Sequence, residues 1–258
     1  MIEGMSTASA ETNVKDGVVD NAGWIDAWAS GRTDFHQSTH DRFLDLKEAE
    51  VFEGKTKSVF MPLCGKSLDI LWMYNHGHTV CGVEIAELAI QQFFEEHGIE
   101  FEVKTLENIG KLYKSKDDRL QLYVADLFEM TPELCGQFDI IFDSKSFVAI
   151  NKSDRQKYVN VLLSLMKTDG KYYLSAFDYD QSVWPGPPHS TPGEVVNSCY
   201  SDRCNIELLE DADQVMKEKQ ASSVEPPVPQ QDYEDFPSAI RAATYAMFRW
   251  YKLTMKQS

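Results

Sequence analysis

Glu84 and Gly65 are the two residues whose types and spacing point most directly to chemistry. The segment around them reads as a strand, a turn that contains Gly65, a helix, and a second strand that ends at Glu84. In doubly wound sheets a carboxylate about 20 residues past such a turn accepts hydrogen bonds from ribose hydroxyls. Glu84 stands at this distance from the glycine, so the unit predicts a site for a ligand that contains a ribose.

The turn itself narrows the class of ligand. It holds a single glycine, Gly65, whereas the loop that binds a dinucleotide pyrophosphate needs several glycines for close backbone approach. A ligand with a ribose and no phosphate therefore fits better, and S-adenosylmethionine is such a ligand. A nicotinamide-dependent oxidoreductase is disfavoured for the same reason.

Two aspartates follow later strands at the same expected edge of the sheet. Asp126 comes directly after the strand expected at 121–125, where its carboxylate could accept a hydrogen bond from an adenine amino group. Asp143 closes the strand expected at 139–142, where it could meet the cationic amino group or the sulfonium of the cofactor. An ordinary turn residue after a strand is the alternative for Asp143.

Other chemistries find little support in the sequence. His76 and His78 flank Gly77 in a tight turn at the opposite edge of the sheet, and no acidic cluster is near them in sequence. A turn is therefore favoured over a metal pair. Nucleophile elbows, phosphate-binding loops and zinc spacings do not occur in the sequence. We therefore expect no bound metal, and the sequence disfavours hydrolase and kinase functions.

The charge of the chain limits its partners. Its 258 residues include 25 Lys and Arg against 41 Asp and Glu, which gives a formal net charge of −16 at pH 7. Such a balance repels nucleic acids and anionic membranes and favours a soluble, monomeric protein. We expect neither nucleic acid nor membrane as a partner.

The cysteines and the N-terminus indicate a compartment. The five cysteines include no C-x-x-C pair, so neither a disulfide framework nor a zinc site is expected. The N-terminus lacks the basic start and apolar core of a secretory signal. The sequence therefore predicts a cytoplasmic protein.

Strand-like and helix-like segments alternate along the chain, which is typical of a parallel sheet in an α/β fold. Helices are expected at residues 67–75, 85–97, 154–167 and 192–200. Strands are expected at residues 57–63, 79–83, 121–125, 139–142, 171–177, 205–210 and 246–255. The pattern predicts a doubly wound, mostly parallel sheet of seven strands.

The helix expected at 154–167 has the most complete local signature. Ser153 is placed as its N-cap, with Gln156 three positions later as in a capping box. Apolar residues then recur at helical spacing, and Asp169-Gly170 is placed as the exit from the helix.

One domain, residues 21–258, is expected after a disordered tail at 1–20, which is small, polar and aperiodic. Residues 21–50 are expected to form a helical cover, because Trp24 and Trp28 share one face of a helix. Core packing is the alternative for this pair. Residues 220–238 are rich in proline and are expected to form an insertion before the last strand.

Five segments carry a more specific signal. They are WIDAWASGRTDFHQ at 24–37, PLCGK at 62–66, GVEI at 82–85, VAI at 148–150 and PGPP at 185–188. In these segments the chain resembles the thiopurine S-methyltransferase family. The resemblance implies a class I, Rossmann-like, S-adenosylmethionine-dependent methyltransferase that is cytosolic and monomeric and acts in xenobiotic metabolism.

The resemblance also implies roles for individual residues. Aromatic side chains of the cover would close over the cofactor and the substrate, and Glu84 would bind the ribose. The cofactor-binding residues expected by position are Trp24, Trp28, Thr33, Phe35, Leu63, Gly65, Glu84, Ile85, Asp126, Leu127 and Asp143. The residues expected on the substrate side are Phe35, Ser144, Lys145, Trp184 and Pro185.

One position departs from the family pattern. Animal members carry an arginine directly after the strand-end aspartate, whereas this chain has Ser144 and then Lys145. A lysine supplies a point charge but not the planar, bidentate fork of a guanidinium. The departure puts a preference for thiopurines in question.

The leading hypothesis is transfer of a methyl group from S-adenosylmethionine to the sulfur of a small aromatic or heterocyclic thiol. Such thiols ionise near neutrality, so positioning in a water-poor pocket is expected to suffice and no catalytic residue of the protein is named. One alternative is a different acceptor, namely an aliphatic thiol or a selenium or arsenic species. Another is a protein that binds S-adenosylmethionine without turnover.

Overall fold

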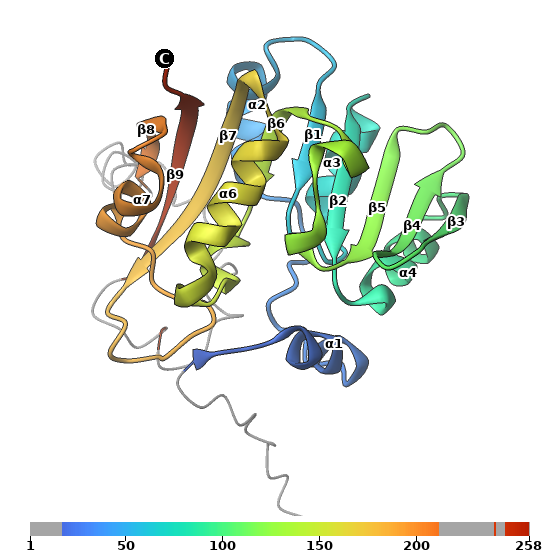
Figure 1. Cartoon of the computed structure of the whole chain (residues 1–258), viewed down its shortest axis with the longest axis horizontal. Helices are drawn as coiled ribbons and strands as arrows, with labels where there is room; N and C mark the ends of the chain where they lie inside the picture. The colour runs from blue at the N-terminus through green and yellow to red at the C-terminus, as the bar shows by residue number, and fades with distance from the viewer. Residues whose placement is uncertain (1–16, 212–239, 241–245, 258) are drawn as a thin grey trace, which may run out of the picture.

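A computed structural model describes residues 17–211, 240 and 246–257 of the chain, and Figure 1 shows their arrangement. The described strands form one sheet of nine, in the order β3-β4-β5-β2-β1-β6-β7-β9-β8. The strands are β1 (Ser58–Met61), β2 (Thr79–Glu84), β3 (Phe101–Leu106), β4 (Gly110–Ser115), β5 (Leu120–Ala125), β6 (Phe138–Asp143), β7 (Met166–Tyr179), β8 (Cys204–Asp211) and β9 (Ala246–Met255). Most of the expected tail at 1–20 and the whole insertion at 220–238 lie outside the described residues.

The five central strands of the sheet are parallel. Strand β1 pairs with β2 and β6, β2 also pairs with β5, and β6 also pairs with β7, all in parallel. Antiparallel strands extend both edges, with β3 and β4 beyond β5, and β9 and β8 beyond β7. The predicted α/β, Rossmann-like fold class is confirmed.

The sheet contains two strands beyond the seven predicted, namely the hairpin of β3 and β4. Strands β3 and β4 pair with each other from Phe101↔Ser115 to Leu106↔Gly110, and β4 extends the sheet from β5. The hairpin carries charged residues on a largely solvent-accessible edge, so its segments lack the apolar runs of the central strands. The alternation of Phe101, Val103 and Thr105 with charged residues was the signal that could have identified β3.

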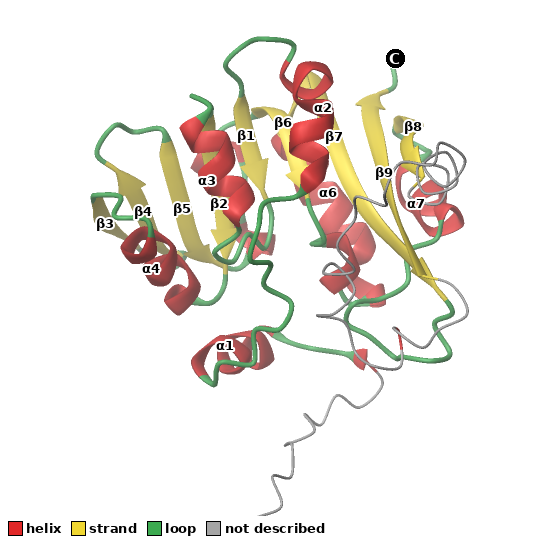
Figure 2. Ribbon diagram, turned by 180° about the vertical axis from the view of Figure 1, so that it is seen from behind, coloured by secondary structure: helices red, strands yellow, loops and turns green. Residues whose placement is uncertain are grey.

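Helices cover both faces of the sheet. Figure 1 shows α6 in front of the sheet, and Figure 2 shows α2, α3 and α4 against the opposite face. The buried residues form a separate apolar cluster on each side, one built with α6 and α7 and the other with α2, α3 and α4. The α-helices are α1 (Asn21–Ala29), α2 (Arg42–Phe52), α3 (Leu68–Asn75), α4 (Glu87–Glu96), α5 (Pro132–Cys135), α6 (Arg155–Leu165) and α7 (Gly193–Tyr200). None of the helices in the described part is long and apolar enough to cross a membrane.

Helix α6 begins and ends differently from the prediction. A 3-10 turn at Lys152–Asp154 precedes it, so Ser153 lies inside that turn and is not the N-cap. Strand β7 begins at Met166, directly after the helix, and includes Asp169-Gly170. Pairing with β6 explains the difference, because the ladder skips from Phe138↔Met166 to Ile140↔Lys171 and the extra β7 residues bulge. Tertiary pairing here overrides a local signal for a helix end.

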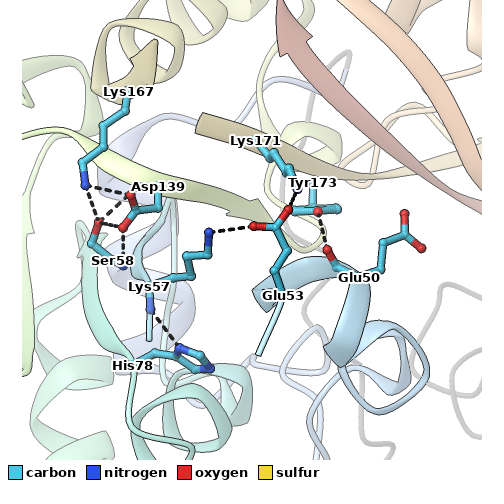
Figure 3. Close-up of polar contacts among 9 residues, drawn as sticks. All are labelled: Glu50, Glu53, Lys57, Ser58, His78, Asp139, Lys167, Lys171 and Tyr173. Carbon is cyan, nitrogen blue, oxygen red and sulfur yellow. Dashed lines mark hydrogen bonds and ion pairs between the residues drawn. The ribbon is translucent and has the colours of Figure 1, made fainter. Parts of the chain in front are cut away.

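Polar side chains join the amino ends of the strands, as Figure 3 shows. Asp139 of β6 accepts hydrogen bonds from Ser58 of β1 and from Lys167 of β7. Burial raises the pKa of Asp139, but the bonds from Lys167 and Ser58 outweigh burial and bring it to about 2. Glu53, after α2, pairs with Lys171 and Lys57. These contacts stabilise the amino ends of the strands, which lie opposite the carboxyl ends where Glu84, Asp126 and Asp143 stand.

Candidate cofactor and acceptor site

The carboxyl ends of β1, β2, β5 and β6 share one edge of the sheet because these strands are parallel. Helix α1 lies across this edge, beneath the ends of β1 and β2 in Figure 1. The glycine turn follows β1, Glu84 ends β2, and Asp126 directly follows β5. The structure therefore brings the central residues of the predicted cofactor site to one edge.

Glu84 is a buried carboxylate with a relative exposure of 6%. Its Oε2 accepts a hydrogen bond from the N–H of Gly65 at 3.0 Å, and its Oε1 accepts one from the N–H of Ala86 at 2.9 Å. Burial raises the pKa of Glu84, and the backbone N–H groups of Ala86, Gly65 and Ile85 oppose this rise. A carboxylate has about four acceptor sites. The three backbone N–H groups leave acceptor capacity for a ribose hydroxyl, so the residue fits the group expected there.

The turn between β1 and α3 brings the backbone close to Glu84. Leu63 and Gly65 both have left-handed backbone conformations, with φ of 43° and 49°. The N–H of Cys64 donates to the carbonyl of Val83 at 2.9 Å, which joins the turn to β2. A Cβ atom on Gly65 would lie 3.0 Å from Cζ2 of Trp28, so the turn also fits closely under α1.

Aromatic residues of the cover pack over this turn. Trp28 has a relative exposure of 5% and packs with Ala86, the N-cap of α4, and with Ala89 in α4. Phe35 stands edge-on to Trp24 and Trp28, with ring centroids 5.5 and 5.6 Å apart. Trp28 is thus buried, as the alternative of core packing for the tryptophan pair proposed. Its ring also lies next to Gly65, at the predicted cofactor site.

The loop after α1 holds the remaining residues predicted for the cover. The carbonyl of Thr33 accepts a hydrogen bond from the N–H of His36 at 2.8 Å, which forms a turn around Phe35. The ring of Phe35 is 45% exposed. It is thus the most open member of the aromatic group formed with Trp24 and Trp28.

Asp126 lies at the edge and is also bound to the cover. Its Oδ1 accepts from the N–H of Phe128 at 2.8 Å, and its Oδ2 accepts from Nδ2 of Asn21 at 2.9 Å. Leu127, the next residue, is buried. Asn21 starts α1, so the predicted adenine position is in contact with the cover.

A second contact fixes the segment that leads into α1. The side-chain amide of Asn151 accepts from the N–H of Val19 at 3.1 Å and donates to the carbonyl of Val19 at 2.9 Å. Sequence reasoning missed both Asn21 and Asn151 as anchors of the cover. No local signal could have found them, because each partner is more than 100 positions away in the chain.

Asp143 is fully buried, and its carboxylate is bound within the fold. Its Oδ1 accepts from the N–H groups of Ser146 and Phe147, both at 3.0 Å, and its Oδ2 accepts from the hydroxyls of Tyr158 and Tyr172, both at 2.6 Å. Burial raises the pKa of Asp143, and these hydrogen bonds oppose the rise. Four donors occupy the lone pairs that were predicted to face the cofactor, so the geometry assigns Asp143 to internal packing.

Apart from Phe35, which lies in the cover, the residues predicted on the substrate side form two groups. Ser144 donates from Oγ to Oδ2 of Asp41 at 3.4 Å, and Nζ of Lys145 lies 5.4 Å from the centre of the Phe248 ring. Nε1 of Trp184 donates to the carbonyl of Pro187 at 3.1 Å, within the loop that includes Pro185. Trp184 and Phe248 pack against the same apolar cluster, which brings the two groups together.

Two carboxylates next to Ser144 were missed in the sequence. Asp69 of α3 is 3% exposed and accepts from the N–H of Asp41 at 2.6 Å. Burial and the nearby carboxylate of Asp41 raise the pKa of Asp69 to about 6, while Lys145 opposes the rise. Ser144, at the position where the family resemblance implies an arginine, thus lies next to acidic groups. Within the described residues, no group of three or more His, Cys, Asp or Glu could hold a metal ion.

Solved methyltransferase structures share this fold. A 1,6-didemethyltoxoflavin-N1-methyltransferase from Burkholderia thailandensis, with bound S-adenosylhomocysteine, has a TM-score of 0.53 at 14% identity and covers 92% of this chain and 87% of its own. A phosphoethanolamine N-methyltransferase 2 from Haemonchus contortus, in complex with S-adenosyl-L-methionine, has a TM-score of 0.57 at 13% identity and covers 92% of this chain and 58% of its own. At such identities the likeness shows the fold alone.

The sequence comparisons are more specific. The profile of the thiopurine S-methyltransferase family matches residues 19–231. A probable thiopurine S-methyltransferase from Danio rerio is 36% identical over 201 residues, which cover 77% of this chain and 87% of the relative. The thiopurine S-methyltransferase of Bos taurus is 37% identical over 212 residues, which cover 81% and 86%. Together with the strand-end site, these matches show that the chain belongs to the thiopurine S-methyltransferase family.

Proposed function

We propose that this protein transfers a methyl group from S-adenosylmethionine to the sulfur of a small aromatic or heterocyclic thiol. The observation that carries the proposal is the buried carboxylate of Glu84, which has acceptor capacity to spare at the carboxyl end of β2 in a member of this family. The relatives from Danio rerio and Bos taurus are named for thiopurines, which are heterocyclic thiols.

The cofactor supplies an electrophilic methyl group on a sulfonium. Glu84 is proposed to accept hydrogen bonds from the ribose, and Asp126 from the adenine amino group. The turn at Leu63 and Gly65 shapes the floor of the site, while α1 with Trp28 excludes water. Asp143 is left out of the proposed contacts, because its oxygens already accept four hydrogen bonds.

The acceptor is proposed to lie between the aromatic cover and the loop that contains Trp184 and Pro185. Attack of a thiolate on a sulfonium disperses charge, so a pocket with little water favours the transition state over the separated ions. Phe35 and Trp184 would hold a flat ring. Lys145 would provide a point charge for an anionic sulfur, in place of the missing guanidinium.

A second acceptor class is favoured by one observation. Ser144 occupies the arginine position of the animal members and is hydrogen-bonded to Asp41. With a serine in place of a guanidinium, the acceptor site is smaller and less cationic. Such a site would suit an aliphatic thiol, or a selenium or arsenic species, better than a site with an arginine would.

Release of S-adenosylhomocysteine across a panel of acceptors tests the proposal. The panel contains thiopurines, thiophenols, aliphatic thiols, selenite and arsenite, each with purified full-length protein. We expect the largest kcat/KM for an aromatic or heterocyclic thiol. A maximum for one of the other classes would favour the second acceptor class. If calorimetry shows that the protein binds S-adenosylmethionine but no acceptor yields a product, the protein is a binding protein without turnover, and the proposal is wrong.

We also propose that the protein is a cytoplasmic monomer that acts in xenobiotic metabolism. All five cysteines are free thiols, which suits a reducing compartment. The net charge of −16 opposes self-association and binding to polyanions. We propose that residues 21–258 form one domain, with α1 and the loop after it as its cover. Of the range 21–50 expected for the cover, α2 instead packs against the sheet. Gel filtration with light scattering tests the monomer, and fractionation of cells tests the compartment.

A further inference from the structure

An open cavity of about 880 Å³ lies at the carboxyl end of β7, next to the loop of Trp184, whose carbonyl accepts hydrogen bonds from Tyr179 and Gln181 of the cavity wall. Its wall comes from the start of α6, the end of β7, the first turn of α7 and strand β9. It shares no lining residue with the cofactor-binding and substrate-side sets proposed above. Nothing in the proposed methyl transfer uses it.

Arg155 lines this cavity and lacks the partners that a buried guanidinium normally has. It is 8% exposed, and its one hydrogen bond among the described residues runs from Nη2 to the carbonyl of Ser190 at a long 3.3 Å. Its Nε has no acceptor in the described part of the chain, and no carboxylate there forms an ion pair with it. A buried charge without a partner is costly, so such a group usually has a ligand or a functional role.

The groups closest to Arg155 do not neutralise its charge. The guanidinium lies 5.3 Å from the centre of the Phe147 ring, which orders it without neutralising it. Burial, Arg155 and Lys152 lower the pKa of His189 to about 4, so this buried imidazole is neutral at pH 7. Its Nε2 also has no partner among the described residues. Lys152 stands exposed at the rim of the cavity.

The first turn of α7 adds donors to the same cavity. Pro192 is its N-cap and offers no side-chain acceptor, and Gly193 lines the cavity. The first N–H groups of a helix have no acceptor within the helix and favour anions. In α7 the N–H of Val195 donates to the carbonyl of Pro192 at 2.8 Å, which leaves the N–H groups of Gly193 and Glu194 as the donors. Donors from α6 and α7 therefore converge on one space.

The carboxylates around the cavity do not neutralise Arg155. Asp178 forms an ion pair with Arg249, and Asp180 accepts a hydrogen bond from the N–H of Ser182 at 3.0 Å. Glu194 and Asp180 are both exposed to solvent. Negative charge thus lies at the rim or in an existing pair, while Arg155 forms the buried part of the wall.

We propose that this cavity is a binding site for the carboxylate or phosphoryl group of a small molecule, held by the guanidinium of Arg155 and the N-terminal N–H groups of α7. The fork of an arginine matches both kinds of anion, and a charge-assisted bond would pair the guanidinium with a negative charge that the described residues do not supply. The exposed Lys152 lies where it can strengthen the field at the entrance.

Titration of the purified full-length protein with inorganic phosphate or with acetate, at constant ionic strength set by sodium chloride, tests the site. Thermal unfolding gives one readout, and the Nε–H resonances of ¹⁵N-labelled arginines give a second. In wild type we expect a saturable rise in Tm and a shift of the Arg155 resonance. The stronger of the two ligands identifies the phosphoryl or the carboxylate class.

Arg155→Met keeps the length of the side chain and removes its charge. We expect at least about tenfold weaker anion affinity, which corresponds to about 1.4 kcal/mol, because the charge-assisted hydrogen bonds of the guanidinium are lost. Arg119→Met, which removes a guanidinium paired with Asp117, is the matched control and should bind as wild type does. If Arg155→Met does not fold, Lys152→Gln at the exposed rim replaces it, with an expected severalfold loss.

Two results would overturn the proposal. One is that neither phosphate nor acetate gives the wild-type protein a saturable response larger than its response to chloride. The other is a response that Arg155→Met, or its replacement Lys152→Gln, retains in full. Neither readout involves methyl transfer, so the outcome is independent of the proposed function.

Discussion

Glu84 is a carboxylate that the fold buries next to backbone donors and without a cation among its hydrogen-bond partners in the described residues. Burial raises the pKa of Glu84, so its ionised form costs stability in the empty site. Groups that are costly in this way concentrate at binding sites, where a ligand offsets the cost. The burial of Glu84 and its spacing from Gly65 thus both indicate that this carboxylate binds a ligand.

Glu84→Gln should weaken binding of S-adenosylmethionine by about 1–3 kcal/mol, because an amide cannot provide a charged acceptor to a ribose. Isothermal titration calorimetry measures the change. Glu96→Gln, which removes an exposed carboxylate paired with Lys66, serves as the control and should bind as wild type does. Equal affinity of Glu84→Gln and wild type would remove the ribose assignment.

Asp69 predicts a pH dependence of stability. Burial and Asp41 raise its pKa from 3.8 to about 6 in the folded protein. As the pH rises, Asp69 loses its proton in the unfolded chain before it does so in the folded protein. Its contribution to the free energy of unfolding is therefore complete below about pH 4 and is lost as the pH rises through about 6. Asp69→Asn should remove about 1 kcal/mol of the difference in unfolding free energy between pH 5 and pH 8. Urea denaturation at both pH values measures it.

The control for this experiment is Asp169→Asn, which changes an exposed aspartate in the bulge of β7. It should keep the difference between pH 5 and pH 8 that wild type shows. A variant Asp69→Asn with the same pH dependence as wild type would show that Asp69 ionises as an ordinary aspartate.

At the scale of elements, α1 is attached to the rest of the fold by a few defined contacts. Asn151 holds the chain before it at Val19, Asp126 holds its first residue, and Trp28 packs over Gly65. The helix lies across the carboxyl edge of the sheet in both views (Figures 1 and 2). Its position makes it the element that would separate a ligand at Glu84 from solvent.

Gly65→Ala should loosen this element. The new Cβ would lie 3.0 Å from Trp28, and alanine is strained at a φ of 49°, so Trp28 should become more exposed and cofactor affinity should fall. Gly77→Ala is a matched control, because Gly77 also has a positive φ, of 88°, but has no atom within 4 Å of the new Cβ. Both should lose about 1 kcal/mol of stability.

Tryptophan fluorescence quenching and calorimetry separate the two variants. Quenching by acrylamide should increase for Gly65→Ala and stay at the wild-type level for Gly77→Ala. If both variants, or neither, changed in quenching and affinity, contact between the turn and α1 would not govern the site.

At the scale of the whole molecule, Asp143 joins separate elements through the core. Its four hydrogen bonds come from the segment after β6, from α6 and from β7, and Tyr172 continues the network to Tyr200 of α7 at 3.0 Å. Buried networks of this kind stabilise when every member is satisfied. The structure favours a role in stability for a residue that the sequence placed at the cofactor.

Tyr158→Phe should therefore lower the free energy of unfolding by about 1.5–3 kcal/mol, the contribution of a hydrogen bond to a charged group. Affinity for S-adenosylmethionine should change less than twofold. Tyr123→Phe, which removes a longer bond of 3.3 Å to the carbonyl of Leu134, is the control and should cost less. Lost affinity without lost stability would instead support the cofactor role of Asp143.

The sequence by itself determined the central strands and the edge at which a ligand would bind. Strand β2 and the glycine turn were predictable because apolar runs and a turn glycine are local signals. The positions of Glu84 and Asp126 follow from them, since every parallel strand ends at the same edge. The roles of these residues toward a ligand stay predictions.

Only the tertiary structure decided how distant segments share polar groups. The bulge of β7 depends on pairing with β6, and the hydroxyls that bind Asp143 come from Tyr158 and Tyr172. The guanidinium of Arg155 is buried where it meets the ring of Phe147 and the carbonyl of Ser190, which come from other segments of the chain. Local sequence patterns report the preferences of neighbours in the chain, whereas hydrogen-bond partners and burial are set by packing between elements that are far apart in it.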